Sequence, residues 1–171
     1  VPCEPHAYVA GECVEVCASS NNFVRIGLSQ HIDVEAAITL LSYETGGPDV
    51  EFGRLAHQGP GTHTLRYAPD VADFEARVTT VEPGGCFELE SFPVPSILLV
   101  LAGSGETGVL AHGARSPPRR HRYALVPGTA LYVTEGTLHL AVSVPSSNSG
   151  PLRLVRCCEN LDGVLQTVAE T

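Results

Sequence analysis

The chain has 171 residues, a formal net charge of −9 and a pI of about 5.1. An acidic chain is disfavoured as a general binder of nucleic acid or of an acidic membrane, and no apolar run reaches the roughly 18 residues of a membrane span. We therefore expect neither a nucleic-acid partner nor a membrane partner. The length allows one domain of ordinary size, or one domain with a remnant of another.

Two features of the composition concern the whole chain. It contains no Met, which predicts that it begins inside a longer protein. It contains 6 Cys but no CxxC pair, whereas a secreted disulfide scaffold is usually shorter and denser in Cys. This pattern favours reduced thiols and a cytoplasmic location.

Residues 1–28 are predicted to form two short hairpins. Side chains on a strand alternate between its faces, so His6 and Tyr8 point the same way, and Glu15 and Arg25 join them from the following strands. A His, a Tyr, a carboxylate and an Arg are costly to bury unless they serve one another or a ligand. The pattern therefore predicts a binding or catalytic site, or part of one.

A structural zinc site is a competing interpretation of the same region, with Cys3, His6, Cys13 and Cys17 as ligands. If Cys13 and Cys17 lie on one extended strand, their Cα atoms are roughly 13 Å apart, at about 3.3 Å per residue. Zinc–sulfur bonds of about 2.3 Å cannot span that separation. The zinc interpretation therefore requires a loop at these cysteines.

After residue 28 the apolar period changes to that of a helix. Asp33 can cap the N-terminus, and we expect the helix to end near residue 43, before the Gly-Gly-Pro stop at 46–48. The apolar residues on one side of this helix are Val34, Ala37, Ile38 and Leu41. Residues 50–60, rich in Gly and Pro, are then predicted to form a long loop, and His57 and His63 are interpreted as solvated loop histidines.

The rest of the chain is predicted to consist of short strands separated by turns. The expected strands are 64–67, 74–81, 86–92, 96–101, 107–111, 123–126, 130–134, 138–144 and 152–158. Turn residues recur at the spacing of an all-β sandwich or barrel.

Several sequence blocks resemble type I mannose-6-phosphate isomerases. They are PHAY at 5–8, GECVE at 11–15, SNN at 20–22 and VRIGL at 24–28, followed by weaker matches at 32–34, 41–43, 96–100 and 156–158. The resemblance spans most of the chain but only the C-terminal part of the family. It implies an all-β, cupin-like jelly-roll barrel, with the end of a preceding cupin and one short connecting helix. The implied division is 1–44 for the end of the catalytic cupin plus the helix, and 45–171 for the C-terminal β domain.

The resemblance also implies a function and a set of site residues. The family interconverts mannose 6-phosphate and fructose 6-phosphate with zinc, at the entry to GDP-mannose supply. By this likeness His6 is a zinc ligand, Arg25 and Glu15 are catalytic, and Tyr8 and Asn21 contact the substrate. The remaining zinc ligands are expected upstream, in the N-terminal remainder of the same enzyme, so the fragment alone is expected to be inactive. The family usually has Asp where this chain has Asn21, and either a catalytic or a turn role fits that position.

Two other functions fit the same sequence. The chain could be a non-catalytic, cupin-like module for sugar binding or regulation. It could also be a structural β domain that mediates assembly. Absence of an upstream Gln-x-His and Glu in the full gene would favour the first, and protein packed against the His6 face would favour the second.

Overall fold

The computed structural model describes residues 10–19, 33–42, 46, 50–109, 122–137 and 140–162. The chain divides into two compact units, Val1–Val50 and Glu51–Thr171. The predicted boundary at 44/45 lies close to this division, and the assignment of the first unit to a preceding cupin stays a prediction.

The first unit contains helix α1, Val34–Leu40. The predicted cap is confirmed, because the side chain of Asp33 accepts a hydrogen bond from the backbone N–H of Ala36 at 3.1 Å. The helix ends earlier than predicted, since Leu41 already has extended backbone with ψ at 132°. Ala37 is buried, whereas Ile38 is 59% exposed, so only part of the predicted apolar side is covered.

Residues 10–19 contain no strand, although the sequence predicts one through Cys13, Glu15 and Cys17. Alternation of side chains is not enough for a strand, because a strand also needs a neighbouring backbone with which to pair. The geometric argument against zinc binding by Cys13 and Cys17 therefore does not apply. Both cysteines are exposed and free of disulfides.

The second unit is built from ten strands among the described residues. Their bounds are β1 Arg54–Gly59, β2 Thr62–Tyr67, β3 Glu75–Val81, β4 Cys86–Glu88, β5 Ser96–Ala102, β6 Gly105–Val109, β7 Tyr123–Leu125, β8 Ala130–Val133, β9 Leu140–Ser143 and β10 Leu152–Cys158. Each of the strands predicted after residue 60 is present, most of them with small shifts of their ends. Strand β4 is much shorter than predicted, because it ends at Glu88 rather than at residue 92. Alternation and turn residues are local signals, which is why the sequence locates these elements well.

Strand β1 corrects the predicted loop over 50–60. It pairs antiparallel with β2, and Gly59 faces Thr62 at the end of the hairpin. Pro60 and Gly61 form the turn between them, with Gly61 at φ 65°, in the left-handed region that favours Gly. The Gly-Pro-Gly run is therefore a tight hairpin turn rather than part of a long loop.

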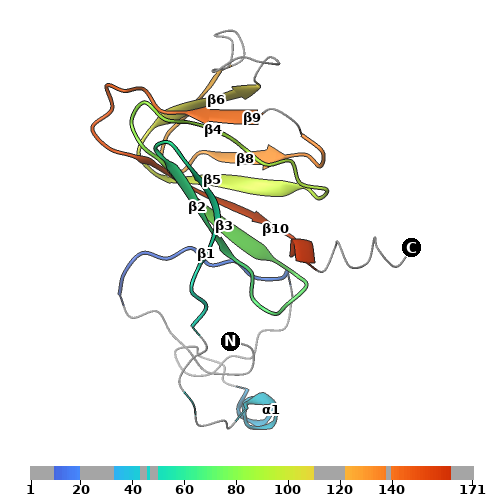
Figure 1. Ribbon diagram of the computed structural model, residues 1–171. Coiled ribbons are helices and arrows are strands. Elements are labelled where there is room, and N and C mark those ends of the chain that lie inside the picture. The colour runs from blue at the N-terminus through green and yellow to red at the C-terminus, as the bar shows by residue number, and fades with distance from the viewer. Residues whose placement is uncertain are drawn as a thin grey trace. The chain divides into compact units, whose positions relative to one another are not determined.

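The strands form two antiparallel sheets (Figure 1). One has the order β1-β2-β3-β10-β5-β8, and the other has the order β4-β9-β6-β7. From β3 onward the strands form four antiparallel pairs. The pairs β3–β10 and β5–β8 belong to the first sheet, and they face the pairs β4–β9 and β6–β7 of the second sheet. This strand order is that of an eight-stranded jelly roll, extended at one edge by the β1–β2 hairpin. The prediction of an all-β jelly roll is confirmed.

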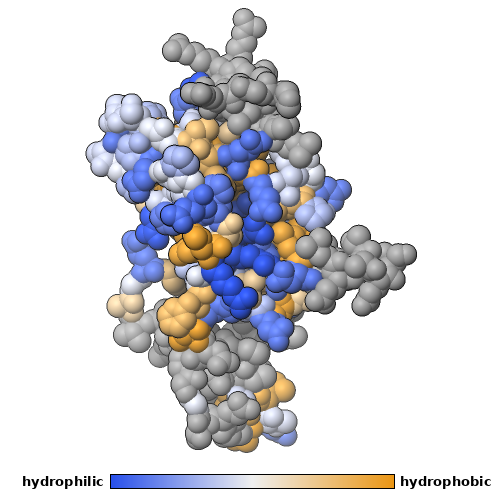
Figure 2. Space-filling view, viewed as in Figure 1, coloured by the Kyte–Doolittle hydropathy of each residue, from blue (hydrophilic) through white to orange (hydrophobic). Residues whose placement is uncertain are grey.

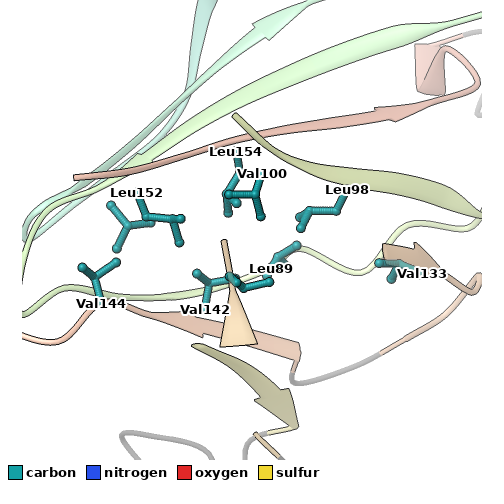
Figure 3. Close-up of a cluster of buried hydrophobic side chains, with 10 residues drawn as sticks. Leu89, Leu98, Val100, Val133, Val142, Val144, Leu152 and Leu154 are labelled. Atoms are coloured by element: carbon teal, nitrogen blue, oxygen red, sulfur yellow. The ribbon is translucent and has the colours of Figure 1, made fainter. Parts of the chain in front are cut away.

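An apolar core fills one part of the space between the two sheets (Figure 3). Leu152 and Leu154 reach it from β10, and Val142 reaches it from β9 in the opposite sheet. The full set of buried residues is Val81, Leu89, Leu98, Val100, Leu125, Val133, Val142, Val144, Leu152 and Leu154. Each such side chain contributes roughly 1.5–3 kcal/mol when it is fully buried.

Polar and apolar side chains are mixed on the surface. Figure 2 shows hydrophilic side chains over the middle of one face, with hydrophobic patches among them. Large exposed apolar side chains include Phe52, Leu55, Ile97, Tyr123 and Tyr132. No helix in the described part of the chain is long and apolar enough to cross a membrane.

The turn between β5 and β6 requires Gly at position 103. Gly103 has φ 77°, and a Cβ at this position would collide with the carbonyl oxygen of Pro151 and lie 2.8 Å from the Cα of Leu152. Gly128 has a similar φ of 87°, but a Cβ there would meet no atom within 4 Å. Substitutions at these two positions therefore distinguish the effect of backbone strain, which both share, from that of steric collision, which occurs only at position 103.

We predict that Gly103→Ala destabilises the fold much more than Gly128→Ala. The second change should cost about 1–2 kcal/mol for the left-handed backbone alone. The first adds a collision with backbone that cannot rotate away. Equilibrium urea unfolding of both variants measures the difference, and equal losses would contradict the steric argument.

Candidate functional site

The structure describes one of the five predicted site residues. Glu15 is exposed and lies in the first unit. His6, Tyr8, Asn21 and Arg25 lie outside the described residues. The arrangement of these five side chains therefore stays a prediction.

A cavity of about 330 Å³ opens into the jelly roll beside the apolar core. It is lined by six apolar residues, Ala56, Phe87, Leu89, Phe92, Leu98 and Leu154. It is also lined by six polar residues, His57, Thr64, Arg77, Thr79, Glu90 and Arg156. Apolar walls with a few convergent polar groups are the usual make-up of a small-molecule site.

The polar wall comes from the inward faces of three neighbouring strands. Thr64 on β2 faces Thr79 on β3, and their hydroxyls are hydrogen-bonded at 2.9 Å. Two residues away along the strands, Arg66, Arg77 and Arg156 face one another in register across β2, β3 and β10. We call these three residues the arginine row. Like charges on directly opposed strands repel, so the row requires counter-ions.

Glu75 is the counter-ion for two members of the arginine row. Its side chain is fully buried and accepts hydrogen bonds from Arg66 Nη2 at 2.6 Å, Arg77 Nε at 2.9 Å and the Leu161 N–H at 3.0 Å. Burial alone would raise the pKa of Glu75, but these hydrogen bonds outweigh it and lower the pKa. Glu75 is therefore ionised in the folded protein.

The third member, Arg156, has only neutral hydrogen-bond partners among the described residues. Nε donates to the Ser96 hydroxyl at 2.9 Å, and Nη1 donates to the Glu90 carbonyl at 2.6 Å. The residue is only 6% exposed, and burial lowers its pKa to about 10, so it is still charged at neutral pH. Its guanidinium carbon lies 3.6 Å from the centroid of the Phe92 ring, over which Arg77 also lies, at 4.4 Å.

His57 lines the cavity, and the sequence interpretation wrongly placed it in a loop. It belongs to β1 rather than to a loop, although its side chain is exposed as expected. Its ring centroid lies 5.0 Å from that of Phe87 on β4, which brings the first strand of one sheet next to the other sheet. His63 is also exposed and lies on β2.

The sequence signals for the arginine row were present but ambiguous. Within β3, Glu75, Arg77 and Thr79 alternate with more apolar residues, and the usual expectation places the apolar side inward. The structure instead buries Glu75 and Thr79. Hydrogen bonds from Arg66 and Arg77 reverse the usual preference, because a buried carboxylate is tolerated when it is paired.

Comparison with known proteins connects the chain to one group of enzymes. No family model matches it. The chain is 40% identical over 103 residues to mannose-6-phosphate isomerase 1 of Arabidopsis thaliana, which is 60% of this chain and 23% of that protein. It is 35% identical over 109 residues to the mannose-6-phosphate isomerase of Schizosaccharomyces pombe, or 60% of this chain and 26% of that protein. The resemblance to mannose-6-phosphate isomerases is confirmed.

The similarity covers a limited share of those isomerases. The chain spans about a quarter of the length of the curated relatives that it matches. This share is consistent with the predicted C-terminal portion of a longer enzyme.

Solved structures with a similar fold are distant. A cupin-2 domain from Rhodospirillum rubrum is 18% identical, with a TM-score of 0.46, and the match covers 69% of this chain and 73% of that one. Vicilin from hazelnut, Corylus avellana, is 15% identical with a TM-score of 0.49, and the match covers 64% of this chain and 32% of that one. Similarities of this size carry no functional argument, so the assignment of a jelly roll rests on the strand order itself.

The zinc site expected of a mannose-6-phosphate isomerase is not formed by the described residues. They contain no group of three or more His, Cys, Asp or Glu side chains that could hold a metal ion. The predicted ligand, His6, lies outside them.

The cysteines of the jelly roll are poor nucleophiles. Burial raises the pKa values of Cys86 and Cys157, and raises that of Cys158 to about 12. The thiolate is the reactive form, so these three residues are almost entirely protonated at neutral pH. The raised pKa values therefore favour a structural rather than a redox role for Cys157 and Cys158.

We predict that Glu75→Ala destabilises the jelly roll by about 3 kcal/mol, the lower end of the range for breaking a buried ion pair, since it leaves two partly buried arginines without the Glu75 carboxylate. The lower end applies because the side chain of Arg66 is 22% exposed. Denaturant unfolding at neutral pH measures the loss, with exposed Glu82→Gln as the control.

The same pair of variants tests the pH dependence. The folded-state pKa of Glu75 is lowered, so its contribution is complete above the ordinary pKa of a glutamate and is lost as pH falls through the lowered value. Wild type and Glu82→Gln should show this loss, and Glu75→Ala should not. Parallel stability curves for all three proteins would contradict the assignment.

Proposed function

We propose that this chain is part of an isomerase that interconverts mannose 6-phosphate and fructose 6-phosphate. The supporting observation is the 40% identity over 103 residues with mannose-6-phosphate isomerase 1 of Arabidopsis thaliana. In this proposal residues 1–28 contribute to the active site and the jelly roll is the following domain. The enzyme is cytoplasmic and supplies mannose 6-phosphate for the formation of GDP-mannose.

The proposed chemistry explains the residue types in the first block. Aldose–ketose isomerisation moves a proton between C1 and C2 through a cis-enediol, which requires a base and a positive group near the developing negative oxygen. We assign the proton transfer to Glu15 and the stabilisation of charge to Arg25, with Tyr8 and Asn21 at the substrate. Glu15 is exposed and so can reach a ligand.

His6 is the proposed zinc ligand within this chain. Zinc, when bound, would supply Lewis acidity for the sugar oxygens. The other ligands are proposed to come from the N-terminal remainder of the enzyme. Because a catalytic zinc usually has three protein ligands, His6 alone would hold the ion weakly.

A second candidate is a non-catalytic module for sugar binding or regulation. The cavity of the jelly roll favours this candidate, because it combines apolar walls with hydroxyl and guanidinium groups. The two candidates are compatible if the cavity and the isomerase site are separate.

We predict that Arg25→Ala, made in the full-length enzyme, lowers kcat by about 10²–10³ and leaves the zinc content unchanged. Steady-state turnover of mannose 6-phosphate and metal analysis of the purified protein measure the two effects. The control is Arg153→Gln, which removes an exposed arginine on β10. Wild-type turnover in Arg25→Ala would exclude a catalytic role.

We also predict that the 171-residue chain alone contains less than stoichiometric zinc and does not isomerise mannose 6-phosphate. The full-length enzyme, purified and assayed in parallel, serves as the positive control. Stoichiometric zinc together with isomerase activity in the 171-residue chain would show that the proposed missing ligands are not needed.

A further inference from the structure

The charge of Arg156 sets it apart from the rest of the arginine row. Arg66 and Arg77 are each hydrogen-bonded to the carboxylate of Glu75. Arg77 also pairs with the carboxylate of Glu90. Arg156 is more than nine-tenths buried, yet among the described residues it donates only to a hydroxyl and a backbone carbonyl. The Glu90 carboxylate lies near enough to favour the charge of Arg156, but it is hydrogen-bonded to Arg77 and not to Arg156. A buried charge without a directly bonded anion is costly.

Arg156 also has donor capacity left over. A guanidinium carries five N–H groups, and the hydrogen bonds of Arg156 to the described residues engage Nε and Nη1 but not Nη2. The residue lines the cavity, and no fully buried side-chain nitrogen or oxygen among the described residues lacks a partner. The Nη2 group is therefore not fully buried, and we place its exposed side in the cavity that Arg156 lines, where it can donate to an incoming acceptor.

The rest of the cavity suits a small molecule with hydroxyl groups. The hydroxyls of Thr64 and Thr79 lie on the wall that also carries Arg77 and Arg156. Phe87 and Phe92 provide apolar surfaces, and His57 stands at the exposed rim. At about 330 Å³ the cavity is at the small end of the range for ligand sites, which is roughly 300–1,000 Å³.

We propose that this cavity binds a small metabolite through an oxyanion, a carboxylate or a phosphate, held by Nη2 of Arg156. The anion supplies a directly bonded counter-charge, which Arg156 lacks among the described residues. Arg suits both groups because its planar fork matches their oxygens. The hydroxyls of Thr64 and Thr79 bind polar groups on the body of the same molecule. This ligand site lies in the second unit, whereas the proposed catalytic residues lie in the first.

The test is titration calorimetry on the 171-residue chain with three probes. Mannose 6-phosphate carries a phosphate, gluconate carries a carboxylate, and mannose is the neutral reference. We expect saturable binding of mannose 6-phosphate or gluconate at millimolar concentration or below, and at least tenfold weaker binding of mannose. The anionic probe that binds more tightly shows whether the site prefers a phosphate or a carboxylate.

Three variants locate the binding. Arg156→Gln should weaken binding of the anionic probe at least tenfold. Arg153→Gln removes an exposed arginine from the same strand and should leave binding of the probe unchanged. Ala56→Phe places a large ring at the exposed rim and should block entry without disturbing the core. If Arg156→Gln does not fold, Ala56→Phe decides the question.

Two results would overturn the proposal. One is the absence of saturable binding of either anionic probe to the wild-type chain. The other is unchanged binding in Ala56→Phe or in folded Arg156→Gln, which would place the probe elsewhere. A purely structural role for Arg156 would alter stability alone. Isomerase turnover is measured separately in the full-length enzyme, so failure of this proposal leaves the proposed isomerase function unaffected.

Discussion

The buried carboxylate of Glu75 is the interaction on which this end of the jelly roll depends. Arg66 and Arg77 face each other on adjacent strands, and without an anion between them their charges would repel. The same carboxylate accepts the N–H of Leu161, just after β10. Asn160 adds hydrogen bonds to the carbonyls of the segment between β2 and β3. The network therefore ties the end of β10 to the start of β3, which lies far from it in sequence.

This network divides the interior of the jelly roll into two parts. Toward one end, Leu152, Leu154 and Val142 pack against one another and exclude solvent. Toward the other, charged residues must keep hydrogen-bond partners, so the interior cannot collapse into a purely apolar core. A cavity between the packed part and the charged part is the structural result. Arg156 lines this cavity and is only 6% exposed, and its hydrogen bonds to the described residues leave Nη2 unengaged.

We thus propose a different chemistry for each of the two units of the chain. The motif residues His6, Glu15 and Arg25 carry the resemblance to mannose-6-phosphate isomerases and the proposed isomerisation. The jelly roll carries a cavity whose polar groups come from β2, β3 and β10. Aldose–ketose isomerisation needs a base and a group that stabilises the enediolate, whereas the cavity offers guanidinium and hydroxyl groups suited to binding. A separate ligand site in the second unit would allow binding there to be studied without the catalytic residues.

The sequence by itself determined the strands after residue 60, the Asp33 cap and the likeness to mannose-6-phosphate isomerases, because alternation, capping and motifs are local properties of the chain. It did not determine strand β1 or the arginine row. Alternation shows which side chains share a face of a strand, but not which face points inward or which strands become neighbours. The pairing of β10 between β3 and β5 brought Arg156 beside Arg77, and the packing of this sheet against the second one buried the side of β3 that carries Glu75 and Thr79.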